Sequence, residues 1–274
     1  MKLRVLAGAG NTFAVVDGTT ETLPADVAGV ARRLCTRGWR GELPALDGML
    51  VVTRSAGADC RMKIYNADGS SPEACGNGLR LVAKFAREQG FTHRDQLEVE
   101  TDAGVRGVEL VRDRAGVVVA ARARMGVPRG LERDVRLVTS RGAVLATLVD
   151  MGNPHCVLFV DDERTSPVSE LGRELEFHPR FPARTNVEFA AMRNERLFLR
   201  VWERGVGETA ACGTGACATA VAAALEGKVS LPVDVELPGG RLTVDWGENG
   251  EVVLSGPCED LWSGEIALEG ASSR

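Results

Sequence analysis

The sequence has no run of about 18 apolar residues, the length that a membrane-spanning helix needs. It also has no excess of positive charge, because its 274 residues include 33 Lys and Arg against 38 Asp and Glu, a net charge of −5. Nucleic acids and anionic membranes bind basic surfaces, so neither is expected as a partner. The apolar start is interrupted by Gly8 and Gly10, and its alternation through Leu3, Val5 and Ala7 favours a strand over a signal peptide. We therefore expect a cytoplasmic protein.

The cysteine pattern lacks the signs of disulfides and of a metal centre. Seven cysteines form an odd set at irregular spacing, in a chain large enough not to need cross-links, which indicates free thiols. His155 stands beside Cys156, but no Cys-x-x-Cys or His-x₃-His spacing accompanies it, so no metal is expected. Five cysteines have no special context and are expected in the core as small hydrophobic residues: Cys35, Cys60, Cys156, Cys217 and Cys258.

An internal repeat singles out the other two cysteines. The segment 64–78, IYNADGSSPEACGNG, aligns without gaps on the segment 201–215, VWERGVGETAACGTG. Both begin with an apolar–aromatic pair followed by a polar residue. Both end in Ala-Cys-Gly-x-Gly, which contains Cys75 in one copy and Cys212 in the other. The two cysteines therefore form a matched pair.

Each copy of the repeat lies between a predicted strand and a predicted helix. The strands are expected over 61–65 and 197–202, and the helices over 77–88 and 215–228. The second helix is rich in alanine on nearly all sides, which is typical of a helix buried all round, and Gly227 is expected to end it.

A second, weaker sequence similarity relates the two halves of the chain, because a Gly-Asn pair precedes a predicted strand in each half. We therefore expect an α/β (α+β) fold of two pseudo-symmetric domains that face each other across a cleft. The N-terminal domain is expected over 1–120 and the C-terminal domain over 121–262. A last strand at 266–268, within the segment 263–274, is expected to return to the first domain.

A cysteine directly before a helix is well placed for acid–base chemistry. The free N–H groups and the dipole of the first helical turn favour thiolate over thiol. The same N–H groups can hold a carboxylate, and flanking glycines allow its close approach. Two such loops, facing each other, place sulfurs on both sides of one bound amino acid. Inversion of an α-carbon needs this arrangement, because one thiolate removes the proton and the opposite thiol returns one in a dry site.

The segments that carry these features resemble diaminopimelate epimerases, in order and over the whole chain: AGAGNTFAVVDG, YNADGSSPEACGNGLR, MGNPHC, FPARTNVEF and WERGVGETAACGTGAC. The resemblance implies two domains, each a mixed, barrel-like sheet wrapped around a central helix, with the active site in the interdomain cleft. It implies epimerisation of L,L-diaminopimelate to the meso form, for lysine and peptidoglycan precursor biosynthesis. It also implies a homodimer that uses neither pyridoxal phosphate nor a metal.

The resemblance assigns roles to individual residues. Cys75 matches the thiolate that acts on the L,L-isomer, and Cys212 matches the acid that protonates the opposite face. His155 and Glu203 match groups that help to manage protons. The positions that match substrate-binding residues are Asn11, Asn66, Gly76, Asn77, Asn153, Asn186, Glu203, Arg204, Gly213 and Thr214, with Arg204 facing the distal carboxylate.

One segment, 41–48, departs from the family's pattern. Asp47 is kept, but Gly48 stands where some relatives use a glutamine to contact the substrate. This wall of the pocket is therefore expected to be reshaped, and Gly48 is not counted as a binding residue.

Several alternatives remain open. A proline or hydroxyproline racemase needs a small apolar pocket, which Arg204 and the asparagines disfavour, whereas a histidine racemase also needs a distal polar group. A non-catalytic amino-acid-binding protein can use the helix starts, but it leaves the two matched cysteines without a role. The glycines of segment 205–210 form a weak dinucleotide fingerprint that the other copy lacks, so no nucleotide cofactor is expected.

Overall fold

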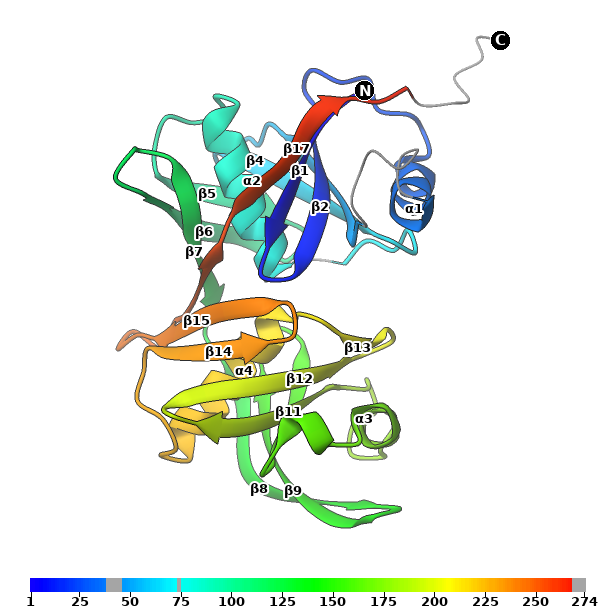
Figure 1. Ribbon diagram of the computed structural model, residues 1–274, viewed down its shortest axis with the longest axis vertical. Helices are drawn as coiled ribbons and strands as arrows, with labels where there is room; N and C mark the ends of the chain where they lie inside the picture. Colours follow the sequence, from blue (N-terminus) through cyan, green and yellow to red (C-terminus); the bar gives the residue numbers. More distant parts are fainter. Residues whose placement is uncertain (38–45, 73–74, 268–274) are drawn as a thin grey trace. The chain divides into compact units, whose positions relative to one another are not determined.

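The computed structural model describes residues 1–37, 46–72 and 75–267, which form two compact units. Unit 2 contains Arg124–Gly256, and unit 1 contains the described residues on either side of it. Each unit combines a mixed sheet with helices (Figure 1). No helix in the described part of the chain is long and apolar enough to cross a membrane.

Unit 1 is a sheet with two parallel pairs among antiparallel ones. The parallel pairs are β2 with β3 and β4 with β5, and β17 pairs antiparallel with β1. The helix α1 follows β2, and α2 follows β4. The elements are β1 (Lys2–Gly8), β2 (Asn11–Asp17), α1 (Val27–Arg37), β3 (Gly48–Thr53), β4 (Cys60–Asn66), α2 (Gly76–Glu88), β5 (Gln96–Thr101), β6 (Gly104–Arg112), β7 (Val118–Gly126, which continues into unit 2) and β17 (Glu259–Glu265).

Unit 2 repeats this order of pairing. Its parallel pairs are β10 with β11 and β12 with β14, and β8 pairs antiparallel with β9 as β17 does with β1. The helix α3 follows β10, and α4 follows β12 and β13. The elements are β8 (Arg129–Thr139), β9 (Gly142–Asp150), β10 (Pro154–Phe159), a 3₁₀ turn (Glu163–Thr165), α3 (Val168–Glu176), β11 (Asn186–Arg193), β12 (Arg196–Glu203), β13 (Gly207–Thr209), α4 (Gly213–Leu225), β14 (Val233–Leu237), β15 (Gly240–Trp246) and β16 (Val252–Pro257).

Each unit wraps its sheet around one helix. The helix α2 packs against the strands β1 to β6, and α4 packs against β9 to β12, β14 and β15. All residues of α4 from Gly215 to Ala223 are buried, as expected for its alanine-rich composition. In α2, the buried Lys84 donates a hydrogen bond to the Val118 carbonyl at 3.0 Å and forms ion pairs with Glu88 and Asp260. The predicted α/β class, with a mixed sheet around a central helix, is confirmed.

The predicted last strand is wrong in position. The strand that returns to unit 1 is β17, and its register runs from Lys2 opposite Glu265 to Ala7 opposite Glu259. This edge strand is rich in polar and charged residues and mostly exposed, so it lacks the apolar alternation that would have revealed it. Ile266 follows the strand, and residues 268–274 lie outside the described part of the chain.

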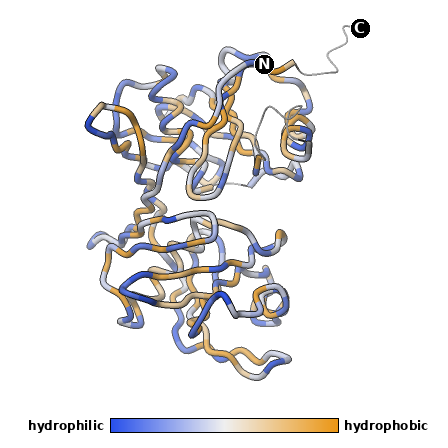
Figure 2. The backbone as a smooth tube through the Cα atoms, in the orientation of Figure 1, coloured by the Kyte–Doolittle hydropathy of each residue, from blue (hydrophilic) through white to orange (hydrophobic). Residues whose placement is uncertain are grey.

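The hairpin of β8 and β9 presents apolar side chains to solvent. Val138 is 71% exposed and Leu145 is 63% exposed. The register pairs Val138 with Ala143 and Arg136 with Leu145, so the two apolar side chains lie on the same face of the hairpin. Figure 2 shows the hydrophobic stretches along this part of the chain.

Candidate active site

Both matched cysteines occupy the residue that begins a buried helix. Cys75 is the N-cap of α2, with φ −147° and ψ 118°, and its Sγ accepts a hydrogen bond from the Gly78 amide at 3.4 Å. Cys212 is the N-cap of α4, with φ −136° and ψ 110°, and accepts from the Gly215 amide at 3.4 Å. The helices begin one and two residues earlier than predicted, because the cysteines themselves cap them.

The first two amides of each helix point toward no acceptor in the described residues. This holds for Gly76 and Asn77 in α2 and for Gly213 and Thr214 in α4. The first N–H groups of a helix have no partner within it, and together with the helix dipole they attract anions. Each cysteine is therefore next to a pair of amides suited to a carboxylate.

The first half-site, which we define as Asn11, Asn66, Cys75, Gly76 and Asn77, lies in unit 1. Asn77 is 1% exposed, and its Nδ2 donates to Oδ1 of Asn11 at 2.6 Å while its Oδ1 accepts from Arg80 at 2.7 Å. The Asn77 side chain thus holds the helix start, and its backbone amide is the group left to contact a ligand. Asn11 is partly exposed at the beginning of β2.

Asn66 ends β4 in a tight turn that is tied to the start of β2. Its amide donates to the Ser70 carbonyl at 2.8 Å, and its Nδ2 donates to the Ser70 hydroxyl at 3.0 Å. Asp47 links the two regions, since its carboxylate accepts from the Thr12 amide at 2.7 Å and its carbonyl accepts from the Ala67 amide at 3.1 Å. The structure therefore brings the turn of Asn66 close to the strand of Asn11.

Gly48 is required by the close pairing of β3 with β4. A Cβ atom there would lie 2.6 Å from the Tyr65 carbonyl oxygen and 3.0 Å from the Phe13 ring. A glutamine cannot occupy this backbone position without displacing the strand, which accounts for the glycine. The rest of the departing segment, residues 41–45, lies outside the described residues.

The second half-site, in unit 2, contains Asn153, His155, Asn186, Glu203, Arg204, Cys212, Gly213 and Thr214. Asn186 is buried, and its side chain bridges two of the segments: Nδ2 donates to the Pro154 carbonyl at 2.9 Å, and Oδ1 accepts from the Arg204 amide at 3.0 Å. Arg204 is exposed, and its guanidinium donates to the Ala183 carbonyl at 3.2 Å. Asn186 thus positions the turn that presents Arg204.

Glu176 holds the other side of this turn. It is 2% exposed at the end of α3, and its carboxylate accepts from the Gly205 amide and from the Trp202 indole, each at 2.8 Å. Gly205 has φ +77°, a left-handed conformation that favours glycine. Trp202 and Gly205, on either side of Glu203 and Arg204, are therefore fixed by a residue that the sequence analysis did not select.

A continuous chain of side-chain contacts leads to Cys212. The Nδ1 of His155 lies 2.6 Å from Oε1 of Glu188, and its Nε2 lies 3.1 Å from Oδ1 of Asn153. The Nδ2 of Asn153 donates to the Thr214 hydroxyl at 3.4 Å, and that hydroxyl lies 3.6 Å from the Cys212 sulfur. Three predicted residues are thus connected to the cysteine, and Glu188 is added to them.

The electrostatic surroundings of Cys212 differ from the expectation. A helix start favours thiolate, but burial and the nearby Glu203 and Glu188 raise the pKa of the Cys212 thiol well above its ordinary value, and the hydrogen bonds from Thr214 and Gly215 oppose this only in part. Burial also raises the pKa of Glu203, whose carboxylate accepts from the Thr209 hydroxyl. The thiol form is therefore favoured at Cys212, in contrast to the general tendency of a helix start to favour thiolate.

Glu188 was missed because it belongs to an apolar strand. It is fully buried near the start of β11, between Val187 and Phe189. A charged residue inside a run whose neighbours on both faces are apolar is the signal that could have found it, because such residues are rarely buried unless paired. Its partner His155 is on another strand, and no sequence pattern gives that pairing.

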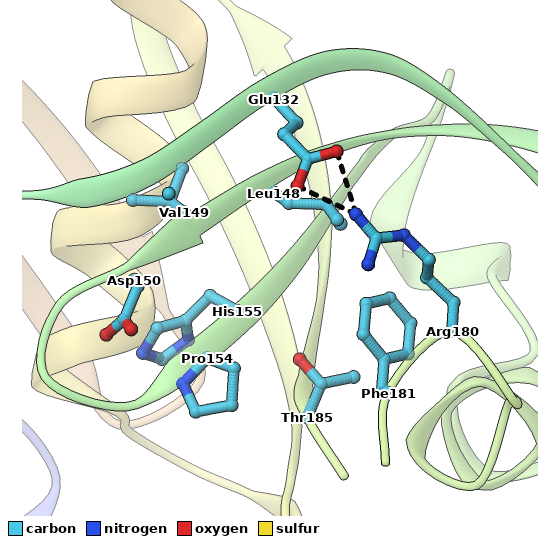
Figure 3. A pocket seen from close by; sticks show the side chains of 10 residues that line it. Glu132, Leu148, Val149, Asp150, Pro154, His155, Arg180, Phe181 and Thr185 are labelled. Atoms are coloured by element: carbon cyan, nitrogen blue, oxygen red, sulfur yellow. Dashed lines mark hydrogen bonds and ion pairs between the residues drawn. The ribbon is translucent and has the colours of Figure 1, made fainter. Parts of the chain in front are cut away.

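A cavity of about 130 Å³ borders this network in unit 2. His155, Pro154 and Asp150 line it together with Phe181 and Thr185 (Figure 3). At its edge, Arg180 donates two hydrogen bonds to Glu132, at 2.7 and 2.8 Å, so its charge is already paired. The cavity thus opens beside His155, and the charges of Arg180 and Glu132 in its wall neutralise each other.

The remaining cysteines match the expected core positions, with one difference. Cys60, Cys156, Cys217 and Cys258 are buried, whereas Cys35, which belongs to α1, is partly buried against the core. Burial raises the pKa of Cys60 to about 12 and that of Cys258 to about 11. Among the residues that the structure describes, no group of three His, Cys, Asp or Glu is arranged to hold a metal ion.

Comparison with solved structures identifies the fold. A phenazine biosynthesis protein of the PhzF family from Bacillus anthracis is similar with a TM-score of 0.74 and 16% identity, over 98% of this chain and 99% of that one. A hydroxyproline epimerase from Agrobacterium vitis is similar with a TM-score of 0.69 and 17% identity, over 99% and 93%. At 16% and 17% sequence identity, these similarities show that the fold is shared and nothing more.

The sequence relatives of this chain define its class, which is that of an isomerase. The sequence model of diaminopimelate epimerase matches residues 4–129 and 147–259. A diaminopimelate epimerase from Moorella thermoacetica is 43% identical over 277 residues, covering 96% of this chain and 98% of the relative. The chain belongs to the diaminopimelate epimerase family.

Proposed function

We propose that the protein epimerises L,L-diaminopimelate to the meso form by proton transfer at the α-carbon. The observation that carries this proposal is the matched pair of N-cap cysteines, each followed by two amides without an acceptor in the described residues. A carboxylate bound by these amides shares the negative charge that develops when the α-proton leaves. The product then enters lysine and peptidoglycan precursor biosynthesis.

In the L,L-to-meso direction, Cys75 acts as the base and Cys212 as the acid. The raised pKa of the Cys212 thiol supports this assignment, because an acid must hold its proton until the carbanion forms. Glu203 is the carboxyl that raises the pKa of the Cys212 thiol most, and His155 reaches the Cys212 loop through Asn153 and Thr214. In the reverse direction the two cysteines exchange roles.

The substrate preference rests on Arg204 and the asparagines. A guanidinium is suited to a distal carboxylate, since it offers several donors in a planar fork. Arg204 is exposed on a turn held by Asn186 and Glu176. This disfavours proline and hydroxyproline, which have no distal carboxylate, and it disfavours histidine, whose distal group is not an anion.

Deuterium incorporation at the α-carbon in D₂O tests the proposal. The protein is incubated with L,L-diaminopimelate, L-proline or L-histidine, and α-deuterium is measured by mass spectrometry. We expect exchange with diaminopimelate at least about 100-fold faster than with the other two amino acids. A site built to bind a distal carboxylate discriminates strongly against substrates that lack this group. Exchange with proline or histidine alone would refute the substrate assignment, and exchange with none would favour a binding protein.

We further propose that the protein acts in the cytoplasm as a homodimer. The exposed apolar face of the β8–β9 hairpin, with Val138 and Leu145, supports self-association, because apolar surface is commonly covered in an assembly. Analytical ultracentrifugation is expected to give a dimer mass. A Val138→Glu, Leu145→Glu variant is expected to be monomeric if this face forms the interface, and a dimer that persists in the variant excludes this face.

A further inference from the structure

The Glu188 carboxyl is a buried ionisable group to which the proposed chemistry gives no role. We propose that Glu188 is a positioning residue for His155, fixing a proton at Nδ1 so that Nε2 faces Asn153 and the Cys212 loop. The inference rests on the proposed function, in which His155 takes part in proton transfer. It concerns a residue that acts through another and does not itself touch the substrate.

Distance and burial support this role. Glu188 and His155 are 0% and 1% exposed, and Oε1 lies 2.6 Å from Nδ1. Their strands β11 and β10 are parallel neighbours within the sheet of unit 2. The other carboxyl oxygen, Oε2, has no hydrogen-bond partner among the described residues, so His155 is the side chain that binds this carboxyl.

The contact at Nδ1 requires a proton between the ring and the Glu188 carboxyl, and the proposal assigns this proton to Nδ1. Two lone pairs cannot face each other at 2.6 Å, so a proton lies between Oε1 of Glu188 and Nδ1 of His155. At the other nitrogen, Nε2 faces the carbonyl oxygen of Asn153, whose Nδ2 donates to Thr214. Nε2 is therefore the nitrogen from which the chain of contacts continues to Cys212.

The start of α4 lies close to the Glu188 carboxyl. A Cβ atom at Gly215 would lie 3.0 Å from Oε1 of Glu188, so a glycine is needed for the helix to approach this closely. The positive end of the helix dipole partly offsets the cost of burying the carboxyl. Burial nevertheless raises the pKa of Glu188, and Glu203 raises it further. The carboxyl thus shares its environment with both Cys212 and Glu203.

The consequence for the reaction is a fixed orientation of the imidazole. A carboxylate that holds one nitrogen of a histidine determines which nitrogen exchanges protons with the site and keeps the ring in place. Without Glu188, the ring loses the partner at Nδ1, and its second tautomer becomes accessible. The loss is expected to reduce turnover more than substrate binding.

The test compares the wild-type protein with Glu188→Gln, which keeps the shape but removes the acid. The Glu163→Gln variant is the matched control, because Glu163 is also buried in unit 2 but pairs with Arg193 at 2.6 Å, outside the half-site. Steady-state epimerisation gives kcat and KM. Nitrogen-15 NMR of the histidine rings reports the proton at Nδ1 directly, and the sequence has only three histidines to assign.

For Glu188→Gln we expect a loss in kcat of at least about 10-fold with KM changed less than about 3-fold. The Nδ1–H signal of His155 is expected in wild type and lost in the variant, because the new amide donates to Nδ1. Compared with Glu188→Gln, the Glu188→Asp variant is expected to recover part of kcat and part of the Nδ1–H signal. Unchanged kcat, or an Nδ1 that carries no proton in wild type, would overturn the inference. If wild type exchanges no substrate, the proposed function fails, while the NMR signal still decides whether Glu188 controls the tautomer.

Discussion

The amide of Gly215 donates to the sulfur of Cys212 across 3.4 Å, so a thiol fills the position that Ser, Thr, Asp or Asn take at most helix starts. Cys75 has the same relation to Gly78 in α2. Sulfur is a weaker acceptor than oxygen, so both helices begin with a weaker cap than the sequence could have provided. Stability alone would therefore favour another residue at both positions. This supports a chemical role for the two cysteines over a purely structural one.

Replacement of either capping cysteine by serine is expected to abolish epimerisation and to preserve the fold. Serine is a stronger cap, so Cys75→Ser and Cys212→Ser are expected to keep the free energy of unfolding or raise it by up to about 1 kcal/mol. The hydroxyl is far less acidic than a thiol, so kcat is expected to fall at least about 100-fold. Urea unfolding and α-deuterium exchange measure the two effects.

The control for this pair is Cys217→Ala, because Cys217 is buried in the same helix as Cys212. This variant is expected to keep kcat within about 3-fold while losing about 1 kcal/mol of stability through the lost packing. Full turnover in either serine variant contradicts the two-cysteine mechanism.

Alkylation of Cys212 is expected to accelerate when Glu203 loses its charge. A raised pKa means that the thiol is protonated at neutral pH, and the thiolate is the form that iodoacetamide attacks. Glu203→Gln removes one of the two carboxyls that disfavour the thiolate, so the alkylation rate at pH 8 is expected to rise. Peptide mass spectrometry after timed quenching measures this rate, with Cys258 in the same digest as the reference. An equal or slower rate in the variant contradicts the assigned electrostatics.

Glu176→Ala is expected to loosen the turn that presents Arg204. The change leaves the Trp202 indole and the Gly205 amide without their acceptor, so the free energy of unfolding is expected to fall by about 1–3 kcal/mol. The KM for diaminopimelate is expected to rise more than kcat falls. Tryptophan fluorescence and steady-state kinetics test both effects, and Glu170→Ala, on the exposed side of α3, should change neither.

A surface ion-pair group in unit 1 gives a pH-dependent contribution to stability. Hydrogen bonds from Arg112, together with Arg87, lower the pKa of Asp95 to about 2. Because the folded-state pKa is depressed, the contribution is present above the unfolded-state value near 4 and is lost as the pH falls toward 2.

Asp95→Asn is therefore expected to lower the free energy of unfolding by only about 0.2–1 kcal/mol at pH 7, since the three side chains are partly exposed. Urea unfolding of both proteins at pH 7 and at pH 3 measures the difference. We expect a smaller difference at pH 3, and a larger one would contradict the assigned direction.

The sequence predicted the parts of the fold that repeat. Cys75 and Cys212 were identified as helix starts because the strand, the glycines and the following helix recur around both. The alanine content of α4 also predicted its burial correctly. Local pattern was sufficient in these cases, because a helix cap and a buried helix are determined by residues near to one another in the chain.

Features that depend on distant partners were not predicted. The strand β17 is an exposed edge held by backbone pairing with β1, so its own side chains carry little signal. The pair of Glu188 and His155 arises from the register of two strands, and the pKa of the Cys212 thiol depends on its burial and on Glu203 and Glu188. Periodicity indicates that a strand exists, but it does not give its neighbours.

The pairing of β1 with β17 sets the order in which the units are completed during synthesis. The ribosome makes β1 first, then all of Arg124–Gly256, and only afterwards the residues of β17. Unit 2 therefore has all of its strands while β1 of unit 1 is paired with β2 but still lacks β17. Although domains commonly fold in the order of their synthesis, here the unit that is begun first is finished second. A nascent chain halted near Gly256 carries a complete second unit and an unpaired β1 edge, which is the surface that a chaperone would have to protect.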